Sequence, residues 1–155
     1  MIRRILSEVT EAFTSTARAE MPAADREAAI RRATAVLMLD VARADYVFDE
    51  DEFDQVLKLM ELHFDLSPED AAQLVNDAGD EAEDLTSVHQ FTKLLHEHLD
   101  EVDKARIVAL LWQIAYADGR LDKYEDSLVL KISDLLYVNR ARVMRLKHDA
   151  ELAAQ

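Results

Sequence analysis

Apolar residues recur every three or four positions along most of this chain, the spacing that gathers side chains on one face of an α-helix. The clearest stripe consists of Phe53, Val56, Leu57, Met60 and Phe64. Comparable stripes occupy residues 2–20, 23–45, 67–79, 88–99, 100–115, 128–136 and 139–146. The pattern predicts an all-α fold of about seven to eight helices.

Two of the predicted helices contain a stretch that is apolar on nearly every face, at residues 36–42 and 107–115. A helix that is hydrophobic all round is buried on all sides. We therefore expect these two helices to pair at the centre of the molecule. The segment 2–20 carries one stripe, Ile2, Leu6, Val9 and Phe13, and is interpreted as a helix packed on the core rather than on a membrane surface.

Two acidic segments share one skeleton. Residues 42–52 and 115–125 both read A-x-A-D-x-x-Φ-D-x-x-E, where Φ is an apolar residue. An apolar run precedes each segment and a helical pattern follows it, so the repeated unit is a helix, an acidic turn and a second helix. When 35–66 is laid over 108–139 at a constant offset, the match continues beyond the motif.

The alignment and the turn signals predict a single domain over residues 1–155. Repeat one spans about 25–79, repeat two about 86–150, and the acidic run 80–85 connects them. Gly79 is expected to end the fourth helix. The constant offset pairs Phe64 with Tyr137, and a slip of one residue in the following loop aligns Ser67 with Asn139. Helix N-caps are predicted at Ser67, at Thr86 or Ser87, at Asp100 and at Asn139.

Composition narrows the classes of function. The chain has 155 residues with only two glycines and two prolines, which suits long helices. Its 32 acidic against 18 basic residues give a formal net charge of −14, which repels the phosphates of nucleic acid. There is no cysteine, so disulfides and thiolate metal sites are excluded. The apolar runs are too short to span a membrane, and a cytoplasmic protein is expected.

The second Asp and the Glu of each motif have a purely structural interpretation. Asp49 with Glu52, and Asp122 with Glu125, have the spacing of a capping box, in which the Asp accepts a backbone N–H and the Glu reaches back. Acidic residues in a first helical turn also suit the helix dipole. Helix capping alone is therefore a sufficient interpretation of these four residues, and a role in cation binding is the alternative.

The first Asp of each motif is harder to explain structurally. Asp45 and Asp118 follow the C-terminal ends of helices, where a negative charge meets the negative end of the dipole. A cation, an arginine or hydrogen bonds within the turn can compensate for that charge. Gly119 favours the left-handed turn that folds Asp118 back toward Asp122.

A cation held by these carboxylates would be a hard one. Oxygen ligands select calcium or magnesium over softer metals. The second turn is similar to the back half of an EF-hand, but Ile114 and Tyr116 stand where the first two carboxylates of that loop belong. A standard EF-hand is therefore excluded, and a cation site needs ligands from both turns or from Asp40. Pairing with an arginine is the alternative for Asp40.

The turn A-D-G-x-L-D-x-x-E at 117–125, its partner at 44–52 and the helical repeat resemble the TerB-like tellurite-resistance family. The resemblance covers about residues 25–150. It implies a compact helical domain with an acidic surface that binds divalent cations, and association with stress-response systems that include membrane partners. Carried over by position, the implied metal ligands are Asp45, Asp49, Glu52, Asp118, Asp122 and Glu125. The first copy departs from the family pattern by placing Tyr46 where glycine is expected.

No catalytic set accompanies the acidic turns, so the chain is interpreted as a non-enzymatic protein. His96 and His98 lack the spacing that puts two zinc-binding histidines on one helix face. Two hypotheses remain open. The chain is a divalent-cation-binding module that acts through protein partners, or it is a metal-independent adaptor that presents an acidic surface to them. The oligomeric state does not follow from the sequence.

Overall fold

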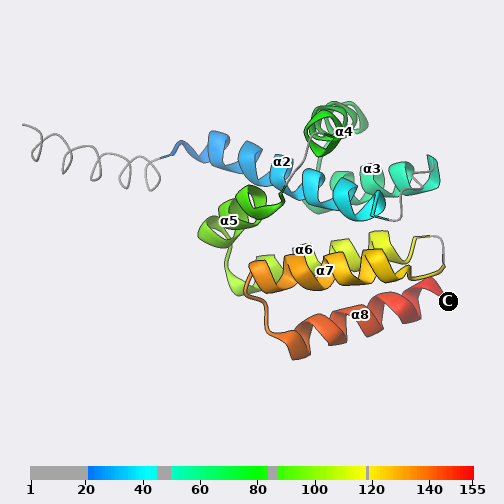
Figure 1. The fold of residues 1–155 in the computed structure, drawn as a ribbon. Coiled ribbons are helices and arrows are strands. Elements are labelled where there is room, and N and C mark those ends of the chain that lie inside the picture. Colours follow the sequence, from blue (N-terminus) through cyan, green and yellow to red (C-terminus); the bar gives the residue numbers. More distant parts are fainter. Residues whose placement is uncertain (1–20, 45–49, 84–86, 118) are drawn as a thin grey trace, which may run out of the picture.

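A computed structural model describes residues 21–44, 50–83, 87–117 and 119–155, and these form a helical bundle without strands (Figure 1). The predicted helix at 2–20 lies outside the described residues. The elements are α2 (Ala23–Ala42), α3 (Glu50–Phe64), α4 (Pro68–Glu83), α5 (His89–His98), α6 (Glu101–Ala115), α7 (Lys123–Leu135) and α8 (Arg140–Ala154). The all-α prediction is confirmed.

Helices α2 and α6 form the centre of the bundle, as predicted. Every residue from Ala33 to Leu39 is buried, and α6 buries nine of its 15 residues. Helix α2 contacts each of the helices from α3 to α7, and α6 contacts α2, α3, α7 and α8. The remaining helices are amphipathic and pack around this pair. The two acidic segments follow the C-terminal ends of these two central helices.

The loops after α3 and α7 have the same backbone design, which supports the repeat. Asp65 and Tyr137 are the only non-glycine residues with positive φ among those described, at 53° and 60°. In each loop the next N–H donates to a carbonyl five residues back: Leu66 to Glu61 at 3.0 Å and Val138 to Ser133 at 3.1 Å. This is the Schellman termination of a helix.

The shared loop corrects the sequence alignment by one residue. Asp65, rather than Phe64, corresponds to Tyr137, because both occupy the left-handed position of the Schellman turn. The one-residue slip therefore lies within the second helix of each repeat, because Asp65 stands 15 residues after the start of α3 and Tyr137 stands 14 residues after the start of α7. It does not lie in the loop that follows.

Side-chain caps begin several helices where the sequence predicts them. Ser67 Oγ accepts from the N–H of Asp70 at 3.1 Å, and Asp100 Oδ1 accepts from the N–H of Asp103 at 2.8 Å. Asn139 Oδ1 accepts from the N–H of Ala141 at 2.8 Å. Ser87 Oγ accepts from the N–H of His89 at 3.1 Å. The N-cap position of α5 is nevertheless Val88, and no side chain caps it, so the N-cap predicted at Ser87 is wrong. Thr86, the other alternative, lies outside the described residues.

The prediction that Gly79 ends the fourth helix is wrong. Helix α4 continues through Gly79 to Glu83, so part of the predicted connection is helical. Packing explains the difference, because α4 lies against α2 at this glycine. The nearest side-chain atoms of Leu39 and Arg43 are each 4.0 Å from the point where a Cβ on Gly79 would stand. A glycine within a helix costs stability without ending the helix when tertiary contacts support it.

None of the described helices is long and apolar enough to cross a lipid bilayer.

Candidate functional site at the acidic turns

The second acidic turn has the left-handed glycine that the sequence predicts. Gly119 has a φ of 81°, and its N–H donates to the carbonyl of Tyr116 at 2.9 Å. The N–H of Ala117 donates to the carbonyl of Ile114 at 3.1 Å. These bonds tighten the end of α6 and turn the chain toward α7. Asp118, between these two residues, lies outside the described ones.

Asp122 serves as the N-cap of α7. Its Oδ2 accepts a hydrogen bond from the N–H of Tyr124 at 2.8 Å, and its backbone is extended, as an N-cap requires. The capping interpretation of Asp122 is therefore confirmed. The equivalent residue of the first turn, Asp49, lies outside the described residues.

The two motif glutamates are buried. Glu52 and Glu125 stand in the first turns of α3 and α7, and their exposed fractions are 3% and 2%. Sequence reasoning treated them as cap residues and missed this burial. The signal was present, because Glu125 lies four and seven residues before the buried Val129 and Ile132, in phase with the apolar stripe. Burying a carboxylate lowers the stability of the fold unless other groups compensate for its desolvation. The burial of a glutamate at the same position of both repeats therefore calls for an explanation.

A small hollow brings elements of both repeats together. Gln55 of α3, Tyr116 and Gly119 of the second turn, and Ala150 and Ala154 of α8 are among the residues that line a space of about 280 Å³. Gln55 lies one helical turn after Glu52, so the start of α3 faces the second acidic turn. Figure 1 shows the C-terminal ends of α2 and α6 at the same end of the bundle.

The last turns of α8 cover the other side of the second acidic turn. A hollow of about 420 Å³ lies there, lined by Tyr116, Gly119, Lys147 and Glu151 among others. Lys147 forms an ion pair with Asp126 at 2.8 Å. Burial raises the pKa of Tyr116, Glu151 and Asp126 add to that rise, and Lys147 opposes it. The turn is therefore packed against α8 rather than isolated in solvent.

Lys147 and Trp112 tie α8 to the central helix beneath the turn. The ammonium of Lys147 lies 5.4 Å from the ring centroid of Trp112. The indole Nε1–H of Trp112 donates to the carbonyl of Val143 at 3.1 Å. Both contacts join α6 to α8, so the position of α8 against the second turn is specified by side chains of the core.

The structure places half of the predicted metal ligands. Asp45, Asp49 and Asp118 lie outside the described residues, whereas Glu52, Asp122 and Glu125 are described. Among the described residues alone, no group of three or more acidic or histidine side chains is arranged to hold a metal ion. A site built from both turns therefore depends on the three aspartates that lie outside the described ranges.

Asp40 has basic residues in its surroundings. Burial within α2 raises the pKa of its carboxyl, and the positive charges of Lys131 and Arg43 partly oppose that rise. The sequence alternative of a basic partner thus has two candidates, Lys131 of α7 and Arg43 one helical turn away. Arg43 also donates from Nη1 to the carbonyl of Gly79 at 3.5 Å, a long contact that leads toward α4.

Comparisons with known proteins identify the family. Searches of curated proteins and of solved structures found no match. A family model described as tellurite resistance protein TerB matches residues 31–148, a span that includes the whole of α3 to α7, more than half of α2 and the first nine residues of α8. The matched region contains both acidic turns and the packed pair at the centre of the bundle, and this chain therefore belongs to the TerB family.

Proposed function

We propose that the chain is a non-enzymatic, divalent-cation-binding helical module of a stress-response system of the tellurite-resistance kind, and that it acts through protein partners. The observation that supports this most is the hollow shared by Gln55 and Gly119. It brings the part of α3 that follows the first acidic segment beside the acidic turn of the other repeat, as a site shared by the two repeats requires.

The chemistry of the turns fits a hard cation. Asp45, Asp49, Asp118 and Asp122 offer carboxylate oxygens, which calcium and magnesium prefer. Capping does not consume Asp122, because a carboxylate has about four lone-pair positions and the N–H of Tyr124 uses one. In this proposal the buried Glu52 and Glu125 support the turns from beneath. The bound cation offsets negative charge that opposes the helix dipoles of α2 and α6.

Cation binding would reach a partner through α8. The last turns of this helix line both hollows at the second turn, through Ala150, Glu151 and Ala154. A cation that reorganises the turn therefore changes the surface that α8 presents. Proteins, including membrane-associated ones, are the proposed partners.

A metal-independent adaptor is the second candidate. It is favoured by exposed apolar side chains on an acidic molecule, since Leu62 of α3 and Tyr137 before α8 are each 71% exposed. Scattered exposed apolar residues are common, so this observation carries less weight. In this alternative the acidic turns serve only to cap helices.

Calorimetric titration separates the two candidates. Calcium, magnesium, manganese and zinc are each titrated into the chain and into its variants Asp45→Asn and Asp118→Asn. The matched control is Asp54→Asn, an exposed carboxylate on α3. The cation module predicts binding that each turn variant weakens at least tenfold and the control leaves unchanged. Absence of heat for all four metals at millimolar concentration would reject it.

The partner role has its own test. Affinity capture with the chain as bait is compared with capture by a double variant, Asp45→Asn and Asp118→Asn, in the presence of the cation and of a chelator. The cation module predicts a partner that is lost both on chelation and in the double variant. A partner retained under both conditions would support the adaptor.

A further inference from the structure

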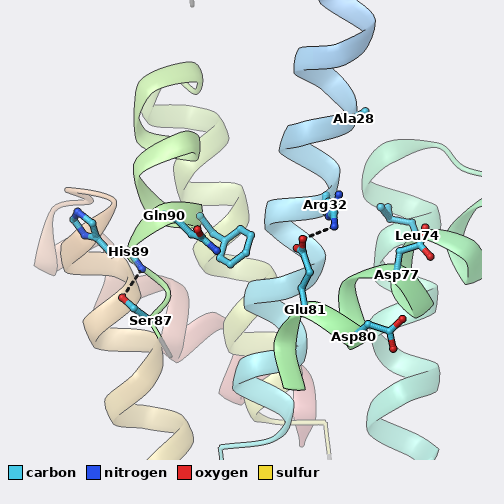
Figure 2. A pocket seen from close by; sticks show the side chains of 10 residues that line it. Ala28, Arg32, Leu74, Asp77, Asp80, Glu81, Ser87, His89 and Gln90 are labelled. Atoms are coloured by element: carbon cyan, nitrogen blue, oxygen red, sulfur yellow. Dashed lines mark hydrogen bonds and ion pairs between the residues drawn. The ribbon is translucent and has the colours of Figure 1, made fainter. Parts of the chain in front are cut away.

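A larger groove lies away from the acidic turns, where α2, α4 and α5 meet (Figure 2). Its volume is about 960 Å³. Ala28 of α2, Leu74 of α4 and Phe91 of α5 supply its apolar walls. Leu74 and Phe91 are only partly buried although they pack against the core, so the groove presents an incompletely covered apolar surface.

The groove has an acidic side. Asp77, Asp80 and Glu81 of α4 line it, and Glu81 pairs with Arg32 across the space between α4 and α2. Figure 2 shows this ion pair beside the carboxylates of Asp77 and Asp80. Helix α4 contains six acidic residues and no basic one. The groove is therefore suited to an apolar helix face that carries basic residues.

The segment before α2 combines an apolar stripe with two basic residues at its start, while over its whole length three glutamates balance its three arginines. Residues 2–20 place Ile2, Leu6, Val9 and Phe13 at helical spacing, and Arg3 and Arg4 stand near the start of the stripe. The segment joins α2 through Met21 and Pro22, and Pro22 precedes the first helical residue. The occupant is thus covalently attached beside the groove, which gives it a high effective concentration.

The lengths agree if the chain reverses at Pro22. Ala28 and Arg32 lie five and nine residues beyond the start of α2, or about 8 Å and 14 Å along the helix. Phe13 and Val9 lie eight and twelve residues before Met21, or about 12 Å and 18 Å along a helix. A helix folded back along α2 therefore brings Phe13 to the level of the groove.

We propose that residues 2–20 form a helix that folds back at Pro22 and packs its apolar stripe into the groove between α2, α4 and α5. Phe13 and Val9 lie against the apolar walls formed by Leu74 and Phe91. Arg3 and Arg4 lie toward the acidic side formed by α4. The groove is then an intramolecular docking surface, independent of cation binding at the turns.

Paramagnetic relaxation tests this docking in the full chain. The chain has no cysteine, so Ser7→Cys gives a unique attachment point for a nitroxide on the polar flank of the stripe. We expect strong broadening of the amide signals of Leu74 and Phe91, which belong to other helices than the tethered one. The amide of Glu151, near the far end of α8, should remain sharp.

Two controls show whether the broadening comes from docking of the stripe within one chain. The first varies Phe13, and the second places the nitroxide on a separate chain. In the labelled chain, Phe13→Ser should restore the signals of Leu74 and Phe91, whereas Phe13→Leu should leave them broadened. No broadening at these amides, or the same broadening with Phe13→Ser, would overturn the proposal. Broadening that appears equally when the nitroxide is on an isotopically unlabelled chain would also overturn it, because the occupant would then be a second copy.

Discussion

The two halves of the molecule share a local plan and differ in where they place their last helix. In each half a central helix, an acidic turn, a second helix and a Schellman loop follow in order. Helix α8 then runs lengthwise beside α6 and α7 and reaches the second turn, whereas α4 crosses α2 and is seen nearly end-on (Figure 1). The two halves therefore share the order of their elements and the way their second helices end. The side chains of the core determine where the last helix of each half packs.

One pair of equivalent positions illustrates this. Trp112 of α6 corresponds to Leu39 of α2 at the constant offset, and both are fully buried. The indole N–H of Trp112 bonds to Val143 and holds α8 along α6. Leu39 has no donor and lies under Gly79, where α4 crosses. The same repeat therefore yields a covered turn in one half and a wide groove in the other.

The largest effect is expected from Trp112→Ala. Loss of a fully buried indole and of its bond to Val143 should lower the free energy of unfolding by about 3–5 kcal/mol. Urea denaturation followed by circular dichroism measures this loss of free energy.

A second pair of variants compares the two equivalent positions. Trp112→Phe removes the indole N–H and should weaken the amide-exchange protection of α8, whereas Leu39→Ala should leave the protection of α8 near its wild-type pattern. Equal loss of α8 protection in Leu39→Ala would break the comparison.

The two glycines should respond in opposite directions. Gly119 has a φ of 81°, so Gly119→Ala should lower the free energy of unfolding by about 1 kcal/mol. Gly79 lies within α4 with room for a Cβ, so Gly79→Ala should raise it by about 0.5–1 kcal/mol. Thermal and urea unfolding of both variants provide the measurement. A loss of stability in Gly79→Ala would show that the crossing of α4 and α2 requires glycine.

A smaller effect is expected at the cap of the second turn. Asp122→Ala removes the acceptor for the N–H of Tyr124 and should cost about 1 kcal/mol of unfolding free energy. The repeat predicts a similar cost for Asp49→Ala, and urea denaturation without added cation compares the two. A cost confined to Asp122→Ala would show that the turns differ in capping as well as in their glycine.

The smallest effect is expected at Asp40. The contribution of its carboxyl to the stability of the fold changes with pH, and the direction of that change follows from the pKa shift. Burial raises the pKa of its carboxyl above the ordinary value of 3.8, so the folded state binds the proton more tightly than the unfolded state. Ionisation therefore removes stability as pH rises through 3.8 and beyond. Asp40→Asn should be more stable than wild type at neutral pH, and the advantage should shrink as the pH falls toward 3.8.

Melting temperatures measured from about pH 3.5 to about pH 7 report this difference. Asp54→Asn, at an exposed position of α3, is the control. An Asp40→Asn variant that is less stable than wild type at neutral pH would show that attraction to Lys131 and Arg43 outweighs burial.

Much of the architecture is predictable from local patterns. The all-round apolar stretch at 36–42 identifies the central helix, and Ser67, Asp100 and Asn139 mark helix starts because their side chains satisfy nearby N–H groups. The end of α4 is not predictable, because contacts with α2 carry the helix through Gly79. The positive φ of Tyr137 is also hidden, since neither glycine nor asparagine marks it.

The candidate site is predictable only in part. The capping role of Asp122 follows from its spacing to Glu125, and the left-handed turn follows from Gly119. The burial of Glu52 and Glu125 depends on helix packing, which capping rules do not consider. The groove beside Ala28 arises from the angle between α2, α4 and α5, and no single segment encodes that angle.

We propose that both acidic turns form one cation site, and an NMR titration of the isotopically labelled chain with calcium tests this proposal most directly. A shared site predicts that the amides of Glu52 and Gln55 in the first repeat shift together with those of Gly119 and Glu125 in the second. All four should follow one binding curve with one dissociation constant. Absence of shifts at millimolar calcium, or a separate curve for each turn, would contradict the claim.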